Sequence, residues 1–282
     1  LKLDVVHVHA PGFAGVEGAR LANRLNVPLI GTFHSKYYDD FLRITRSDVL
    51  ASLGSLYVAN FYARCDEVWT VSADAAETLR SYGYNGPIAI VQNGSEMRVP
   101  DPAFLRAARA KYSLGEGPIL LYVGQIDFKK NLPRIVAAAA LLKAHGHSAQ
   151  LVFAGQGRDR PALEKMCREA GLKNVVFTGH IQDRDILDGL YMAAALFVFP
   201  SLYDTAGLVV SEAASMGTPA VVVRGTAPAE GIRDGENGLT CEDNPESLCR
   251  VMEHYLFELD AASRARIQEQ AQKTIPRPWE TV

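Results

Sequence analysis

The sequence predicts an α/β protein made of two doubly wound parallel sheets that face a cleft, with the first sheet incomplete. Apolar runs of strand length alternate with stretches of helical periodicity from one end of the chain to the other. Residues 5–8 and 28–33 form nearly continuous apolar runs, which are typical of strands buried on both faces of a parallel sheet. The alternation breaks once, between Asn93 and Pro102, and then restarts, which indicates two domains.

Composition limits the class of protein. The 282 residues are 48% hydrophobic and 22% charged, with a formal net charge of −3, as in an ordinary globular chain. This charge excludes nucleic-acid binding through bulk positive charge. The longest nearly unbroken apolar run, at 135–142, is far shorter than a membrane span. The four cysteines form no C-x-x-C pair, so we expect reduced thiols in a cytoplasmic protein and no metal site.

The first part of the chain, residues 1–112, offers four strands that alternate with helices. We expect the strands at 4–9, 28–33, 67–72 and 87–91, and the helices at 14–25, 49–64 and 73–82. The chain starts without Met and with a run that reads as an interior strand. We therefore expect a partial, N-terminally truncated domain that lacks two strands.

Six strands follow in residues 113–262 and predict a complete doubly wound domain. We expect the strands at 119–123, 150–154, 175–178, 196–199, 220–223 and 238–241, and the helices at 132–145, 159–170, 183–195, 207–216 and 245–258. Residues 263–282 should form a C-terminal helix that packs back towards the first domain. Open α/β sheets bind ligands at the carboxyl ends of their strands, so the site should lie there.

The segment 199–219 carries one candidate site. A strand ends at Pro200, a loop carries Asp204, and a helix begins near Gly207 with Glu212 inside it. The free N–H groups of Ala206, Gly207 and Leu208 form an anion site, and the two carboxylates lie about 10 Å apart along the helix axis. This order suits a sugar, a diphosphate and a ribose. Alternatively, Asp204 caps the helix and Glu212 lies on a solvated face.

The segment 121–133 carries a second candidate site. A strand ends at Gly124, and Asn131 is placed to N-cap a helix that has Pro133 in its first turn. Lys130 then lies at a strand-to-helix turn on the ligand edge, where its charge could neutralise a leaving diphosphate without a metal. Lys129 competes for this role, and either lysine could instead be a solvated surface charge.

Together these segments resemble the C-terminal domain of the retaining glycosyltransferases of family 4, which have the GT-B fold. That family's E-x7-E signature reads here as Asp204-x7-Glu212, and its G-R-x5-K stretch as Gly124-Gln125-x4-Lys130. Further matches cover nearly the whole chain: DVVHVH at 4–9, GTFHS at 31–35, DEVWTVS at 66–72, VQNGSE at 91–96, AGQG at 154–157 and DGENG at 234–238. The resemblance implies two Rossmann-like domains, the first on the acceptor side and the second binding a nucleotide sugar.

The resemblance also implies a role for each matched position. Glu212 would bind the ribose hydroxyls, and Asp204 the hydroxyls of the transferred sugar, helped by the amides of 206–208. Lys130, with Gly124 and Gln125 in the same stretch, would contact the diphosphate. His34 would face the donor sugar near the reacting carbon. The backbone around Gly179 and His180 would meet the base.

Two departures from the family pattern affect these roles. Asp204 is one methylene shorter than the family's first Glu, so its sugar contact can shift. Gln125 replaces an Arg and removes a bidentate cation, which leaves Lys130 with more of the leaving-group charge. Both departures fit either a different sugar preference or a weakened enzyme.

The resemblance implies a transferase of the EC 2.4 class, of hexosyltransferase type, that retains anomeric configuration and needs no metal or cofactor. Its substrates would be a nucleotide diphosphate sugar and a carbohydrate or lipid-linked acceptor, as in polysaccharide or glycolipid biosynthesis. We expect a cytoplasmic protein, with peripheral association at the inner membrane face for a longer form. The alternatives are a nucleotide-sugar epimerase and a non-catalytic nucleotide-sugar-binding protein.

Three other features have simpler explanations. His7 and His9 alternate on one strand, but no carboxylate lies at ligand spacing, so a metal site is not expected. Asp183-Arg184-Asp185 lies at a helix start, where capping explains it better than metal binding. Gly155-x-Gly157 lacks the third glycine of a dinucleotide motif. Residues 37–40 follow the strand that carries His34 and could contact an acceptor.

Overall fold

The computed structural model describes residues 2–281, which form two compact units. One unit contains the chain up to Asn93 together with Asp204–Ala206, and the other contains Gly94–Tyr203 and Gly207–Thr281. The packing boundary thus lies before the expected one at 112/113. Helix α5 (Pro102–Tyr112) explains the difference, because it packs against α8 (Arg184–Ala193) of the second unit. The two helices approach so closely that a Cβ on Gly189 would lie 2.1 Å from the carbonyl oxygen of Phe104.

The first unit holds a four-stranded parallel sheet in the order β1-β2-β3-β4. Its strands are β1 (Val6–Val8), β2 (Leu29–Phe33), β3 (Glu67–Thr70) and β4 (Ala89–Ile90). Its helices are α1 (Phe13–Leu25), α2 (Tyr37–Thr45), α3 (Asp48–Tyr62) and α4 (Ala73–Ser81). The aromatic rings of Phe33 and Tyr62 lie in the centre of its core, and Ser47 and Ser72 cap α3 and α4.

The second unit holds a six-stranded parallel sheet in the order β10-β9-β8-β5-β6-β7. Its strands are β5 (Ile119–Val123), β6 (Gln150–Ala154), β7 (Val175–Gly179), β8 (Leu196–Phe199), β9 (Ala220–Val223) and β10 (Leu239–Cys241). This is the doubly wound order, in which the chain direction across the sheet reverses between β5 and β8. Ligands bind outside the carboxyl ends of the strands at such a reversal.

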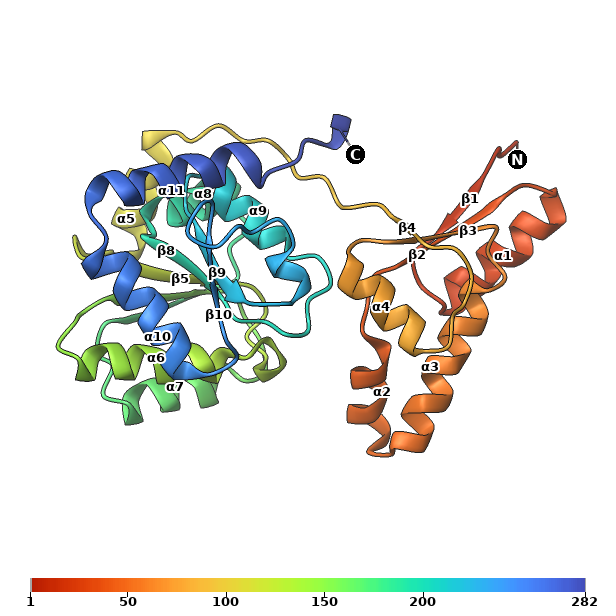
Figure 1. The fold of residues 1–282 in the computed structure, drawn as a ribbon, viewed down its shortest axis with the longest axis horizontal. Helices are drawn as coiled ribbons and strands as arrows, with labels where there is room; N and C mark the ends of the chain where they lie inside the picture. The colour runs from red at the N-terminus through yellow and green to blue at the C-terminus, as the bar shows by residue number, and fades with distance from the viewer. Residues whose placement is uncertain (1, 282) are drawn as a thin grey trace. The chain divides into compact units, whose positions relative to one another are not determined.

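Helices cover both faces of the second sheet (Figure 1). One layer contains α6, α7 and α10, and the other contains α5, α8, α9 and α11. The bounds not yet given are α6 (Leu132–Ala144), α7 (Arg160–Glu169), α9 (Leu208–Ser215), α10 (Pro245–Glu253) and α11 (Ala261–Thr274). Short 3₁₀ segments lie at η1 (Phe128–Lys130), η2 (Ala227–Ala229) and η4 (Trp279–Thr281), and a π-helical turn, η3 (His254–Glu258), extends α10.

The structure confirms the predicted α/β class and the parallel sheets, and each predicted strand is present, some of them shorter than expected. Two helices, α2 and α5, were not predicted. The expected C-terminal helix at 263–282 is instead α11, which ends at Thr274, with Ile267 and Ala271 in the core of its own unit. Within residues 2–281, the helices are all too short or too polar to cross a lipid bilayer.

Candidate active site

The second sheet has a cavity of about 390 Å³ at the carboxyl ends of β5, β6 and β7. Its lining includes Gly124, Gln125 and His180, three residues that the sequence analysis assigned to the donor site. Gly179, a fourth, is the last residue of β7 and adopts a positive φ of 74°. The structure therefore brings the loops after β5 and β7 together around one hollow.

Two glycines that the sequence analysis set aside hold these loops together. A Cβ on Gly155 would lie 1.9 Å from the carbonyl oxygen of Gly124, and one on Gly157 would lie 2.1 Å from that of Ile126. The amide of Gly155 also donates to the carbonyl of Gly179 at 3.0 Å. Close backbone approach, rather than a dinucleotide motif, explains why glycine occupies both positions.

Both candidate lysines reach the loop that follows β8. They lie in η1, where the side chain of Asp127 accepts a hydrogen bond from the amide of Lys129 at 3.0 Å. The Nζ atoms of Lys129 and Lys130 lie 4.1 Å and 5.1 Å from the centroid of the Tyr203 ring. The lysines of the β5 loop thus meet the β8 loop at the reversal point of the sheet, where the Tyr203 ring attracts each ammonium group.

Asn131 lies at the predicted N-cap position, but its side chain binds outside the helix. It occupies the N-cap position of α6, but with a left-handed backbone (φ 61°), so its side chain turns away from the helix amides. Its Nδ2 instead donates to the carbonyl of Pro200 at 3.1 Å and to Oδ1 of Asp243 at 2.9 Å. Asn131 is thus the N-cap residue, as predicted, but without a side-chain capping hydrogen bond, and its side chain ties the β5 loop to the loops after β8 and β10.

Glu212 lies on α9 and is held by two side chains of α8. Arg184 donates to Glu212 Oε1 at 3.1 Å, and the Tyr191 hydroxyl donates to Oε2 at 2.9 Å. Burial raises the pKa of Tyr191 well above its usual value, and the adjacent Glu212 carboxylate raises it further, so the hydroxyl remains a donor. These two hydrogen bonds fix the orientation of the Glu212 carboxylate. The alternative, in which Glu212 is a solvated residue on an exposed helix face, does not fit this arrangement.

Arg184 is in turn anchored to a buried carboxylate. Its Nε lies 3.2 Å from Oδ1 of Asp188, and Arg98 pairs with Asp188 from the other side. Burial raises the pKa of Asp188, while the two arginines oppose that shift. The neighbouring Asp183 caps α8 as predicted, with hydrogen bonds from the amides of Asp185 and Ile186. The contact of Arg184 with Glu212 was not predicted, since nothing in the local sequence links the two residues.

The N-terminus of α9 begins at Leu208, with Gly207 as its N-cap at a φ of 60°. Gly207 has little room for a side chain, because a Cβ would lie 2.9 Å from Cα of Pro228. Asp204 does not occupy the N-cap position, so capping of α9 is not its function. Asp204 and Ala206 pack with the first unit, whereas Gly207 and Leu208 belong to the second.

The first unit gathers three histidines at its strand ends. His34 follows β2, and its Nε2 lies 3.0 Å from Nδ1 of His9, which follows β1. His7 lies within β1, with its ring 4.3 Å from that of His9 and its Nε2 2.7 Å from Oγ1 of Thr32. Burial lowers the pKa of His34 and of His7, and the neighbouring His9 lowers both further. His34 is therefore a neutral hydrogen-bonding group at neutral pH.

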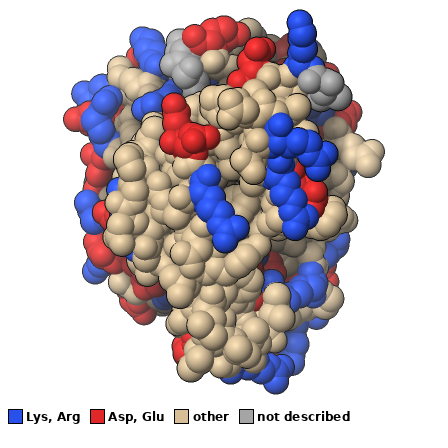
Figure 2. Space-filling view, turned by 90° about the vertical axis from the view of Figure 1, so that its right-hand side faces the viewer, with Lys and Arg blue, Asp and Glu red and all other residues tan. Residues whose placement is uncertain are grey.

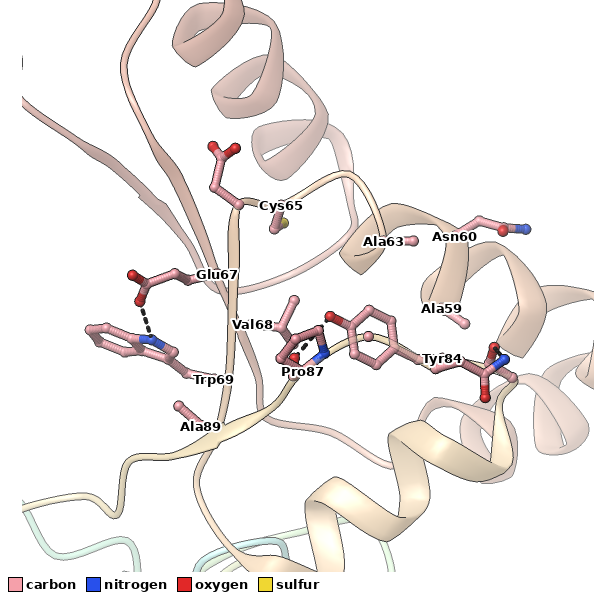
Figure 3. A pocket seen from close by; sticks show the side chains of 14 residues that line it. Ala59, Asn60, Ala63, Cys65, Glu67, Val68, Trp69, Tyr84, Pro87 and Ala89 are labelled. Atoms are coloured by element: carbon pink, nitrogen blue, oxygen red, sulfur yellow. Dashed lines mark hydrogen bonds between the residues drawn. The ribbon is translucent and has the colours of Figure 1, made fainter.

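Two further cavities lie in the first unit. One, of about 420 Å³, lies between α2, α3 and α4 and has a polar lining that includes Lys36, Tyr38 and Asp39. The other, of about 540 Å³, lies beside the amino end of β3 (Figure 3). Its polar side chains bind partners within the protein: Trp69 donates to Glu67 at 3.0 Å, and Tyr84 donates to the Pro87 carbonyl. The first cavity includes part of segment 37–40, which the sequence analysis linked to an acceptor.

In the part of the chain that the structure describes, one group of three side chains is close enough to share a metal ion. It consists of His145, Cys249 and Glu253 and lies outside the candidate site.

Two protein-family models match the chain. The model described as "Glycosyl transferases group 1" matches residues 106–274, more than half of the chain, and the model described as "Glycosyltransferase Family 4" matches residues 1–97. Among curated proteins, an uncharacterized glycosyltransferase of Methanocaldococcus jannaschii is 28% identical over 91% of this chain and 67% of its own length. An alpha-D-kanosaminyltransferase of Streptomyces kanamyceticus is 26% identical over 83% of this chain and 63% of its own length. The chain thus spans about two thirds of these relatives.

Solved structures of the same architecture are numerous. A sucrose-phosphate synthase from Thermosynechococcus elongatus superposes with a TM-score of 0.81 at 24% identity, covering 98% of this chain and 70% of that one. The Anabaena protein HepE, solved in complex with UDP and glucose, superposes with a TM-score of 0.78 at 18% identity, covering 96% of this chain and 72% of that one. At these identities the structures establish a shared fold.

Proposed function

This chain belongs to the group 1 glycosyltransferases, and we propose that it transfers a sugar from a nucleotide diphosphate sugar to an acceptor hydroxyl. The observation that carries the proposal is the cavity at the carboxyl ends of β5, β6 and β7, whose lining includes Gly124 and Gln125 of the family motif and His180. A neighbour of the same fold was solved with UDP and glucose, which supports a nucleotide sugar as the donor.

Glu212 binds the ribose hydroxyls in this proposal. A carboxylate is an acceptor with about four lone-pair directions, and Arg184 and Tyr191 use only two of them. The remaining directions are available to two vicinal hydroxyls. The backbone at Gly179 and His180, beside Gly124 and Gln125, meets the base and the adjoining phosphate.

Lys130 and the free amides at the start of α9 stabilise the leaving diphosphate. Negative charge grows on the diphosphate as the glycosidic bond breaks, and fixed donors aimed at that charge lower the barrier. Lys130 supplies a full charge, and Gly207 and Leu208 supply N–H groups at a helix N-terminus. These groups make the departure of the diphosphate independent of a metal ion.

Asp204 and His34 contact the transferred sugar. With the leaving group stabilised, the acceptor attacks from the face that the diphosphate leaves, and a diphosphate oxygen takes the acceptor proton, so configuration is retained. His34 is neutral at physiological pH and can therefore accept a hydrogen bond from a sugar hydroxyl. The transferred group is a hexose in this proposal, and the acceptor is a carbohydrate or a lipid-linked saccharide.

The acceptor binds in the polar cavity between α2, α3 and α4, and a lipid-linked acceptor explains the apolar surface of α3. Val49, Leu53 and Tyr57 are exposed at helical spacing on one face of that helix. Figure 2 shows the side of the first unit that is on the right in Figure 1, where uncharged residues cover most of the face, with Lys and Arg and also Asp and Glu side chains among them. Such a surface suits peripheral binding to the cytoplasmic face of a membrane.

The test separates binding, hydrolysis and transfer. Purified protein is titrated with a panel of nucleotide diphosphate sugars, and the preferred donor is then incubated with and without carbohydrate and lipid-linked acceptors in the presence of a chelator. We expect saturable donor binding and acceptor-dependent release of the nucleoside diphosphate that the chelator does not inhibit. Donor binding without turnover would indicate a non-catalytic binding protein, and isomerised donor without an acceptor would indicate an epimerase. Either outcome contradicts the proposal.

A further inference from the structure

A cluster of metal-ligating side chains lies at the amino edge of the second sheet, away from the donor cavity. His145 follows the last residue of α6, and Cys249 and Glu253 are one helical turn apart on α10. One ligand atom from each of the three lies within 4.8 Å of the other two. These residues come from segments about a hundred positions apart, so no spacing motif in the sequence marks them.

We propose that His145, Cys249 and Glu253 form a binding site for one zinc ion. An imidazole nitrogen, a thiolate and a carboxylate oxygen together favour zinc over magnesium or calcium, which prefer oxygen ligands. The thiolate and the carboxylate together carry two negative charges, which balance a divalent ion. A water molecule takes the fourth position of a tetrahedral site.

The distances are close to those that zinc requires. Ligand atoms about 2.1 Å from a tetrahedral ion lie about 3.4 Å from one another. The Nδ1 atom of His145 already lies 3.0 Å from Oε2 of Glu253, and the three-atom group spans at most 4.8 Å. The side chains therefore need to move by about 1 Å to surround an ion.

A second histidine holds the carboxylate ligand in place. The Nε2 atom of His147 lies 3.0 Å from the other carboxylate oxygen of Glu253, and its ring stacks on Phe257 with centroids 4.2 Å apart. Carboxylates that bind zinc are commonly fixed by such an outer hydrogen bond, and losing it typically weakens metal binding 10- to 100-fold. His147 is a positioning residue in this site.

Cys249 differs from its partners in exposure. Its side chain is buried, whereas His145 and Glu253 reach the surface, so an ion enters from solvent and meets the sulfur last. The thiol gives up its proton to solvent when the metal–sulfur bond forms.

The experiment measures binding of Zn²⁺ and Co²⁺ to the metal-stripped, reduced chain. We expect one Co²⁺ per chain, with an absorption band from thiolate-to-cobalt charge transfer, and competition by Zn²⁺ but not by Mg²⁺. Cys249→Ser should abolish the band, Glu253→Gln should weaken binding at least tenfold, and His147→Ala should weaken it 10- to 100-fold. Circular dichroism of each variant establishes that it is folded.

The matched control is His254→Ala. His254 pairs with Glu258 at 2.7 Å in a similar exposed His–Glu arrangement on the next helical turn. Its replacement should leave both the affinity and the band unchanged. The proposal is overturned if the chain binds no stoichiometric Co²⁺, if the band persists in Cys249→Ser, or if His254→Ala lowers the affinity as much as Glu253→Gln does.

Discussion

Arg184 donates to Glu212 Oε1 at 3.1 Å and also contacts the buried Asp188 at 3.2 Å, so one guanidinium links a surface carboxylate to the interior. The hydroxyl of Tyr191, which lies on the same helix as Arg184, donates a hydrogen bond to the second oxygen of Glu212. A carboxylate held at both oxygens loses little side-chain entropy when a ligand binds to it. This arrangement is what we expect of a group that binds the donor rather than one that moves during the reaction.

Replacement of Glu212 should weaken donor binding more than it slows transfer. Glu212→Gln keeps the shape of the side chain but removes the charge that Arg184 contacts and one acceptor for the ribose. We expect the Kd for the nucleotide diphosphate to rise about 10- to 100-fold, equivalent to about 1.4–2.7 kcal/mol, with a smaller change in kcat. Calorimetric titration and steady-state kinetics measure the two quantities. An unchanged Kd would remove Glu212 from the donor site.

Lys130 should act mainly on the rate of transfer, with Lys129 as its matched control. Both ammonium groups lie over the Tyr203 ring, at 5.1 Å and 4.1 Å from its centroid, so the two variants lose the same kind of contact within the protein. If Lys130 stabilises the leaving diphosphate, Lys130→Ala should lower kcat about 10²–10³-fold, and Lys129→Ala should lower it much less. Equal losses in the two variants would show that the lysines act only through local structure.

Much of the fold could be predicted from local sequence, because buried parallel strands form continuous apolar runs. Strands β5, β6, β8 and β9 match the prediction residue for residue. Helix α5 was missed, and the contact that places it against α8 is the close approach of Gly189 to the Phe104 carbonyl. That contact joins residues 85 positions apart and leaves no periodic signal.

The clustering of the candidate site residues could be predicted in part. Gly124, Gln125 and His180 line one cavity because each follows a strand of the same parallel sheet, and strand order alone implies that proximity. The partners of Glu212 could not be predicted. Arg184 lies at the start of α8, where helix capping by Asp183 accounts for the local sequence and gives no sign of a contact with Glu212. Asn131 occupies the predicted N-cap position, but its side-chain partners could not be predicted, because a left-handed backbone, which Asn tolerates, turns the side chain towards Pro200.

The histidine cluster should make the stability of the first unit depend on pH. Burial, followed by the charges of His9 and His7, lowers the pKa of His34 below its ordinary value of 6.5. The unfolded chain therefore binds a proton more readily than the folded one, so stability is highest above pH 6.5 and falls as the pH decreases from 6.5 through the lowered pKa. Urea unfolding between about pH 5 and pH 8 measures this slope.

His34→Gln should reduce the dependence of stability on pH, because the variant lacks one of the groups whose pKa differs between the folded and the unfolded chain. His254→Gln, which replaces an exposed histidine outside the cluster, is the control and should leave the slope close to that of the parent. NMR titration of the His34 ring gives an independent check. A His34 pKa at or above 6.5 would contradict the assignment.

Gly157→Ala should destabilise the donor cavity through steric overlap alone. The new methyl group would lie 2.1 Å from the Ile126 carbonyl oxygen, so the loops after β5 and β6 must separate. Overpacking of this kind typically costs about 1–3 kcal/mol. Gly117→Ala is the control, because its Cβ would have no atom within 4 Å. Chemical denaturation should show the loss in the first variant only, together with weaker nucleotide binding.

Asp188 and Asp185 both pair with Arg98, yet their replacement should have very different effects. The Asp188 side chain is 1% exposed and the Asp185 side chain is 57% exposed. Asp188→Asn would leave Arg98 and Arg184 facing a neutral group in the interior, and breaking a buried pair in this way typically costs about 3–5 kcal/mol. Asp185→Asn removes a surface contact, for which about 0.2–1 kcal/mol is usual. The free energies of unfolding of the two variants in urea measure the difference.

Because Arg184 also holds Glu212, Asp188→Asn should in addition weaken nucleotide binding, and Asp185→Asn should not. Equal effects of the two substitutions on stability and on binding would show that the buried carboxylate does not organise this site.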